Sequence, residues 1–160
     1  MAVEFQDFTI KVQGAIDDKI NAVLEECAGE LESQAKRNTT VGRVAGGKTK
    51  NAWEHMVDEA EHTAYIGNSE ETAIWIEFGT GEYALEGNGR KGGWFIPIGN
   101  GEGMISQAVV KAYGFKVIEG KNGMKFAHTY GMKPQRPFHK AYTRLKKAII
   151  KRIQNSLKGL

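Results

Sequence analysis

The sequence predicts an α+β fold, in which a long N-terminal helix and a C-terminal amphipathic helix pack on a small antiparallel β-sheet, with an extended glycine-rich β-hairpin arm. Three observations lead to this prediction: helical periodicity at both ends of the chain, two short alternating segments near its middle, and 13 of the 20 glycines between residues 79 and 131. A chain of 160 residues can bury one core. We therefore expect a single domain over residues 1–160, with the arm inserted at about 80–130.

The N-terminal helix is expected to begin near Phe8 or Asp17 and to end at Arg37. Its apolar residues recur at spacings of three and four, which places them on one side of a helix. Because Cys27 is the single cysteine, it forms no internal disulfide, and we expect it to be buried as a small apolar side chain. The apolar stripe consists of Ile16, Ile20, Val23, Leu24, Cys27, Leu31 and Ala35.

Two short strands are expected to follow this helix, at residues 52–57 and 62–66. A polar loop over residues 38–50 separates them from the helix, and residues 58–61 form the turn between them. The alternation of apolar and polar residues is imperfect in both segments, but it is typical of a small hairpin.

A short helix is expected from about Glu70 to Phe78. Asn68 and Ser69 precede it as capping candidates, and Gly79 follows it as a stop. A buried strand is the alternative, because the apolar residues of this segment suit either element.

The glycine-rich segment is not expected to be a disordered linker. Residues 94–98, Trp-Phe-Ile-Pro-Ile, are too apolar for one. Residues 113–119 and 124–130 are expected to pair as a hairpin, because Asn122 and Gly123 between them form a strong local turn signal. This hairpin and the apolar segment make up the expected arm.

The last helix is expected to begin near Pro137 or Phe138, because proline is favoured in the first helical turn. Its apolar stripe consists of Phe138, Ala141, Tyr142, Leu145, Ile149 and Ile153. The opposite side carries the basic residues Lys140, Arg144, Lys147, Lys151 and Lys158. A solvated exterior, an acidic neighbour and the DNA backbone are the three interpretations of this basic side.

Charge is distributed unevenly, although the net charge is only +3. Residues 1–119 carry 11 Lys+Arg and 19 Asp+Glu, a net −8, whereas residues 120–160 carry 11 Lys+Arg and no acid, a net +11. The basic end could face a nucleic acid or the acidic part of a neighbouring copy. Head-to-tail contacts of the second kind close into rings when the rotation permits.

One segment matches a nucleotide-binding pattern. Residues 42–49 fit G-x-x-x-x-G-K-T, and in a true P-loop Lys48 and Thr49 would hold phosphate and magnesium. A buried strand should lead into such a loop, but the preceding residues are polar and follow the first helix. No later apolar run ending in Asp supplies a second metal ligand. The context therefore argues against a nucleotide hydrolase.

No catalytic, cofactor-binding or metal-binding residues are expected elsewhere. His55, His62, His128 and His139 lack a metal-ligand spacing with one another. Glu77 stands among apolar residues without a partner base or nucleophile, so we expect a structural salt bridge or hydrogen bond for it. The chain is thus expected not to be an enzyme.

Residues 47–53, 73–84 and 134–142 are three segments that resemble those of a family of small tailed-phage morphogenesis proteins, described as neck, head–tail joining or tail-completion components. Residues 47–53 are similar to the family's passage from a loop into a strand, and residues 73–84 contain its Glu-Phe-Gly-Thr-Gly signature. Residues 134–142 contain its Arg-Pro-Phe entry into the C-terminal helix. The chain departs from the family in lacking a proline before the loop and in its long glycine-rich segment.

The resemblance implies a structural virion protein of a tailed bacteriophage or prophage, forming a ring at the head–tail junction through which DNA passes. Its implied partners are copies of itself, other phage connector, neck and tail proteins, and genome DNA through non-specific contact in the channel. A tail terminator and a DNA-binding accessory protein are the alternatives. No apolar run approaches the roughly 20 residues that cross a bilayer, so no membrane partner is expected.

The expected location is the virion neck or tail, after assembly in the bacterial host cytoplasm. Apolar residues beside glycine or proline and the basic side of the last helix are the candidates for contacts with partners. These candidates are Trp75, Glu77, Phe78, Gly79, Trp94, Phe95, Ile96, Arg136, Pro137, Phe138, Lys140, Arg144, Lys147 and Lys151.

Overall fold

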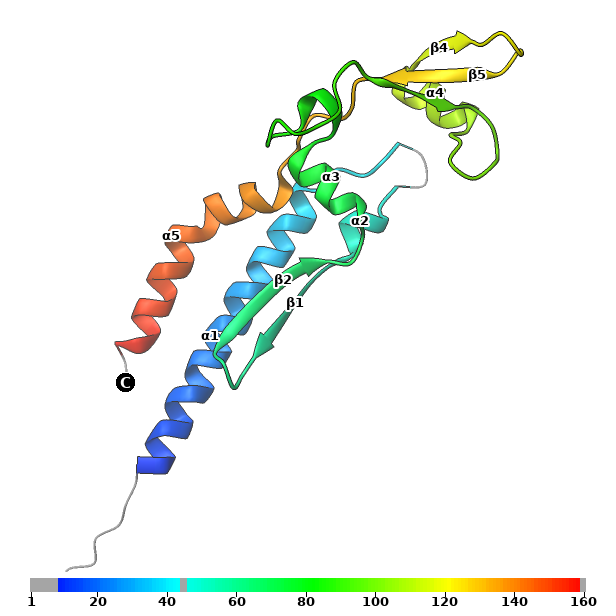
Figure 1. Ribbon diagram of the computed structural model, residues 1–160. Helices are drawn as coiled ribbons and strands as arrows, with labels where there is room; N and C mark the ends of the chain where they lie inside the picture. Colours follow the sequence, from blue (N-terminus) through cyan, green and yellow to red (C-terminus); the bar gives the residue numbers. More distant parts are fainter. Residues whose placement is uncertain (1–8, 44–45, 159–160) are drawn as a thin grey trace, which may run out of the picture.

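The computed structural model describes residues 9–43 and 46–158, with side chains from residue 13 onward. Its architecture is α+β, as predicted, with long helices from the two ends of the chain and two small antiparallel sheets (Figure 1). In chain order the elements are α1 (Thr9–Asn38), α2 (Lys48–Asn51), β1 (Trp53–Asp58), β2 (Thr63–Asn68), α3 (Thr72–Phe78), the 3-10 turn η1 (Gly81–Tyr83), β3 (Trp94–Pro97), α4 (Gln107–Tyr113), β4 (Lys116–Glu119), β5 (Lys125–Thr129) and α5 (Pro137–Leu157).

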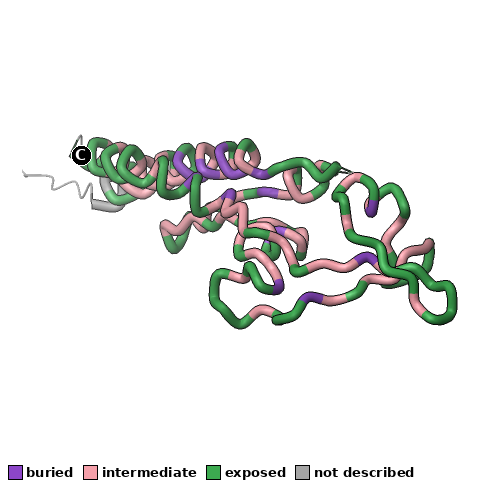
Figure 2. Tube along the Cα trace, turned by 90° about the horizontal axis from the view of Figure 1, so that it is seen from above, coloured by how far each residue is buried: buried purple, intermediate pink, exposed green. Residues whose placement is uncertain are grey.

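α1 and α5 lie side by side and run in opposite directions, and the β1–β2 hairpin packs on another side of α1 (Figure 1). Figure 2 shows the buried residues of these helices gathered in the second half of α1 and the first turns of α5. Trp53 at the start of β1 stacks on Phe138 with ring centroids 5.8 Å apart, and its indole N–H donates to Thr39 Oγ1 (2.8 Å). The core consists of Leu31, Ala35, Trp53 and Ala141, bordered by Ile66, Phe138, Leu145 and Ile149.

The two terminal helices agree with the periodicity of the sequence. α1 begins at Thr9, between the two expected starts, and Phe8 lies outside the described residues. Cys27 is buried, as expected, and this burial raises the pKa of its thiol. α5 begins at Pro137, as the proline predicted.

The β1–β2 hairpin and α3 are confirmed near their predicted bounds. The two strands pair antiparallel from Trp53 opposite Asn68 to Asp58 opposite Thr63. The buried-strand alternative for the next segment is wrong, because it forms α3. Asn68 does not cap that helix; its side-chain oxygen accepts the N–H of Glu70 in a turn before it.

Two histidines of the hairpin contact α1, and one of them, His62, places its Nε2 atom 3.3 Å from Asp17 Oδ1. His55 Nδ1 contacts Glu32, and His55 Nε2 lies 3.0 Å from Glu25 Oε1. The hydrogen bond to Glu32 raises the pKa of His55 above its ordinary 6.5. The hydrogen bond from Lys36 (2.6 Å), followed by that from His55, lowers the pKa of Glu32.

The glycine-rich segment differs from the single extended hairpin that the sequence suggested. It forms a three-stranded antiparallel sheet in the order β3-β5-β4, and α4 lies between β3 and β4 in the chain. Tyr113 ends α4 and does not enter a strand. The signals for this helix were Ser106, whose hydroxyl accepts the N–H of Val109 (3.4 Å), and Gly114, which ends it at φ +66°.

Candidate interaction site at the junction of α3 and α5

The segment that follows α3 and the segment that precedes α5 lie side by side and hydrogen-bond to each other. The amide of Thr80 donates to Met132 O (2.9 Å), and the amide of Met132 donates back to Thr80 Oγ1 (2.9 Å). Beyond them, the amide of Glu82 donates to Tyr130 O (2.9 Å). We call residues 76–82 and 130–138 together the clasp. It joins the helical part of the molecule to the β3–β5–β4 sheet (Figure 1).

The clasp needs glycine where its two segments approach most closely. Gly81 has φ +60°, and a Cβ there would lie 2.3 Å from Tyr130 O. Gly131 has φ +110°, and a Cβ there would lie 2.1 Å from Thr80 O. Because L side chains rarely adopt such φ values and would also collide with backbone, glycine is a packing requirement at both positions.

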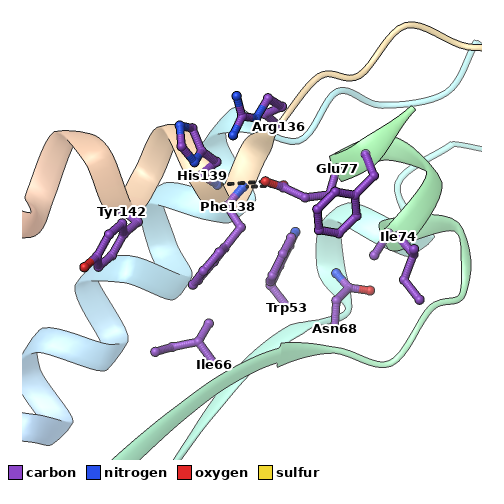
Figure 3. Close-up of a pocket in the computed structure, with 11 residues that line it drawn as sticks. Trp53, Ile66, Asn68, Ile74, Glu77, Arg136, Phe138, His139 and Tyr142 are labelled. Atoms are coloured by element: carbon purple, nitrogen blue, oxygen red, sulfur yellow. Dashed lines mark hydrogen bonds between the residues drawn. The ribbon is translucent and has the colours of Figure 1, made fainter. Parts of the chain in front are cut away.

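Glu77 caps the start of α5. Its carboxylate accepts the backbone N–H groups of Phe138 (2.9 Å) and His139 (3.0 Å), as Figure 3 shows. Arg136, which precedes the helix at φ +55°, makes no side-chain cap of its own, and Pro137 has no N–H. A carboxylate from α3 therefore satisfies the first free donors of α5, where the helix dipole also favours negative charge. This is the structural hydrogen bonding expected for Glu77.

An open groove of about 400 Å³ lies beside the clasp. α3, α5 and the hairpin contribute its walls, and Figure 3 shows Trp53, Ile66 and Phe138 among them. Ile74 is 61% exposed and Phe78 is 47% exposed, although both are apolar. The lining residues are Trp53, Ile66, Asn68, Ala73, Ile74, Glu77, Phe78, Arg136, Phe138, His139 and Tyr142. An exposed apolar hollow of this kind is typical of a surface that a partner covers.

The residues predicted from the sequence to contact partners lie on several different surfaces. Glu77, Phe78, Arg136 and Phe138 line the groove, and Pro137 is fully buried. The hairpin residues that line the groove could not be predicted, because their alternation indicates a strand but not the element that the strand faces.

The remaining candidates lie outside the groove. Gly79 is in the clasp, and Trp75 borders a separate hollow beside α2. Trp94, Phe95 and Ile96 form most of β3 in the other sheet, where Phe95 is 56% exposed and its ring centroid lies 4.8 Å from that of His128. The four basic candidates are exposed along α5, and no described acidic group lies within 4.0 Å of Lys140, Arg144, Lys147 or Lys151.

The described residues of the P-loop-like segment lack the surroundings of a phosphate-binding loop. The element before this segment is α1 and not a strand. The helix at its end, α2, has only four residues. Lys48 Nζ lies 3.1 Å from Glu70 Oε1, and Thr49 Oγ1 lies 2.6 Å from Thr72 Oγ1, so protein groups engage both side chains. Two residues of the pattern, 44 and 45, lie outside the described part of the chain.

Residues 9–43 and 46–158 contain neither a cluster of metal ligands nor a membrane-spanning helix. No group of three or more His, Cys, Asp or Glu side chains in that part could hold a metal ion. None of its helices combines the length and the apolar character needed to cross a membrane.

Residues 4–79 match the model of a phage protein family. The family is HK97-gp10_like, described as "Bacteriophage HK97-gp10, putative tail-component". The match extends from the N-terminal region through α1, the hairpin and α3, and it confirms the resemblance to structural proteins of tailed phages. No curated protein and no solved structure matches the chain.

Proposed function

We propose that the chain is a virion subunit that forms a ring at the head–tail junction, as a neck, head–tail joining or tail-completion component through which DNA passes. The family match to a phage tail component carries this proposal. The clasp supports it, because the Glu-Phe-Gly-Thr-Gly and Arg-Pro-Phe segments are joined by hydrogen bonds and position α5 and the second sheet. In this role the protein holds neighbours in place and performs no chemical step.

The amount of exposed surface supports completion by partners. The accessible area is 11434 Å², whereas a compact monomer of 17.7 kDa exposes about 7,900 Å². The structure does not describe 12 residues of the chain, and an extended peptide of that length has an accessible area of about 1,900 Å². The described part therefore exposes at least about 1,600 Å² more than a compact monomer needs.

Much of this surface is apolar. The groove exposes Ile74 and Phe78, the outer side of the hairpin exposes Met56 and Tyr65, and the second sheet exposes Phe95. Monomeric proteins seldom leave contiguous apolar patches of more than a few hundred Å² uncovered. Several separate contacts, as in a ring that also docks on layers above and below it, would cover all three places.

Deletion of the gene in its phage or prophage tests the proposal. We expect filled heads and finished tails that remain separate in electron micrographs, with infectivity restored by a plasmid copy. Normal numbers of joined, infectious particles without the chain would overturn the proposal. Arrest before heads are filled would overturn it as well, because it would assign the protein to packaging.

A pair of matched variants tests the groove in the same complementation assay. Ile74→Asp places a charge in the groove, and Val41→Asp places one at another exposed apolar site, where Val41 is 53% exposed. We expect Ile74→Asp to fail to join heads and tails and Val41→Asp to succeed, with both proteins folded. If both variants joined heads and tails equally well, the groove would not be a contact surface in this role.

A further inference from the structure

The outer side of the β1–β2 hairpin is acidic and partly apolar. Because His55 points toward α1, its neighbours Glu54 and Met56 point away from it. Met56 is 62% exposed, and its cross-strand partner Tyr65 is 49% exposed. Residues 51–89 contain nine Asp+Glu and no Lys or Arg. We call this surface the hairpin face; it consists of Glu54, Met56 and Tyr65 on the strands and the exposed Glu59 and Glu61 in the turn between them.

The exposed side of α5 is its chemical complement. Lys140, Arg144, Lys147 and Lys151 fall within a narrow arc of the helix and extend over about 16 Å. All four are exposed, and none pairs with a described acid. α5 itself contains no Asp or Glu. We call these four residues the α5 face.

The two faces lie on different sides of α1, so one molecule cannot bring its own faces together. Glu25 and Glu32 meet His55 of the hairpin, whereas Glu30 meets Arg152 of α5 at 2.8 Å. At about 100° per residue these two contact positions are roughly 150° apart around α1. Figure 1 shows the same arrangement, with α5 and the hairpin on opposite sides of α1.

We propose that the hairpin face of one copy docks on the α5 face of the next copy. This inference rests on the proposed function, because it names the head-to-tail contact that such a ring requires. Unlike surfaces on opposite sides of one subunit generate rings or open filaments, whereas a single self-complementary surface stops at a dimer. The dimensions agree, since the six residues of β1 span about 20 Å and the α5 face about 16 Å.

A second copy fits both faces better than DNA does. Phosphates would satisfy the α5 face, but they would leave the acidic hairpin face without a partner and its Met56–Tyr65 pair exposed. Docking between copies pairs the charges and covers this apolar pair in one contact. Charge pairing of this kind also fixes the register between neighbours.

Charge reversal in the complementation assay tests the proposal. The hairpin variant carries Glu54→Lys and Glu61→Lys, the α5 variant carries Lys147→Glu and Lys151→Glu, and the swapped variant carries all four. Each single-face variant is expected to lower the infectious titre by at least about 100-fold, because like charges across an interface oppose binding. The swapped variant should recover most of that loss. Circular dichroism of the purified variants checks that each is folded.

Failure of the swapped variant to recover titre would overturn the contact. If only the α5 variant lost titre, the result would point to DNA phosphate and would also overturn it. Either failure differs from failure of the proposed function, in which deletion of the whole chain leaves joined particles intact. The complementation assay therefore distinguishes failure of the docking contact from failure of the proposed function.

A cross-link provides a second measurement. Met56→Cys and Lys147→Cys in one chain should give a ladder of disulfide-linked oligomers when particles are oxidised, because each site would face the other on a neighbouring copy. Neither single variant should give a ladder, since native Cys27 is buried. Absence of the ladder in the double variant would contradict the proposed docking.

Discussion

At the residue scale, the clasp depends on glycines that have no room for a side chain. Gly81→Ala combines a left-handed φ with a Cβ placed 2.3 Å from Tyr130 O. We expect it to lower the free energy of unfolding by more than about 2 kcal/mol, since the left-handed conformation alone costs about 1–2. Urea denaturation measures the loss.

Gly87→Ala is the matched control for this substitution. Gly87 has a similar φ of +70°, but a Cβ there would meet nothing within 4 Å. We expect the Gly87→Ala variant to lose about 1 kcal/mol of stability, which is the cost of the left-handed backbone conformation alone. Equal losses in the two variants would show that backbone contact in the clasp is not what requires glycine at position 81.

Glu77 allows a second test at this scale. Glu77→Ala removes the carboxylate that accepts two N–H groups of α5, and we expect a loss of about 1–2 kcal/mol, as for other helix caps. Glu77→Gln keeps one acceptor oxygen and should lose less. Glu71→Ala is the control, because Glu71 is exposed and precedes α3 without a side-chain cap. Thermal unfolding compares the three, and a Glu77→Ala variant as stable as the control would rule out the cap.

Single residues also show what the sequence could predict. The isolation of Glu77 among apolar neighbours indicated structural hydrogen bonding, and that was confirmed. Its partners could not be named, because they are backbone groups 61 and 62 residues further along the chain. A sequence pattern identifies a group that needs partners but does not supply them when they come from a distant element.

At the element scale, attachment of the hairpin to α1 depends on pH. The pKa of His55 is raised, so its stabilising contribution is complete below its ordinary value of 6.5 and is lost as pH rises through the raised value. The pKa of Glu32 is lowered, so its contribution is complete above 4.5 and is lost as pH falls through the lowered value. The pair therefore stabilises the fold most between those two values.

Denaturation at a series of pH values checks this. The free energy of unfolding of the native chain should fall as pH rises from 6.5 through the raised pKa of His55. His55→Gln should be less stable at pH 6.5 and should lose this part of the pH dependence. His139→Gln, on the exposed start of α5, should keep it. An unchanged pH profile in His55→Gln would contradict the assignment.

Elements could be predicted where a periodic apolar pattern extends over many residues or where a strong turn signal is present. The apolar stripes of the two terminal helices and the first proline of α5 place those helices, and the Asn-Gly turn lies between β4 and β5. α4 was missed because it has only seven residues, too few to show a period, although Ser106 and Gly114 mark its ends. The pairing of β3 with β5 was missed as well, because no short turn joins those strands.

At the scale of the whole molecule, the accessible surface is larger than that of a compact monomer of this mass, and it includes large apolar side chains such as those of Met56 and Ile74. Composition gave no sign of this, because the hydrophobic content of 41% is ordinary. The groove could not be predicted either, since α3, α5 and the hairpin each contribute part of it. The separation of charge along the chain was visible in the sequence, but only the fold places the two charged faces on different sides of α1.

A reconstruction of the finished particle by electron cryomicroscopy, with the chain located by comparison with the deletion particle, tests the central claim most directly. The account predicts a closed ring of identical copies of this chain between head and tail, surrounding the DNA passage. Absence of the chain from the joined particle, or its presence as isolated copies away from that passage, would contradict the account.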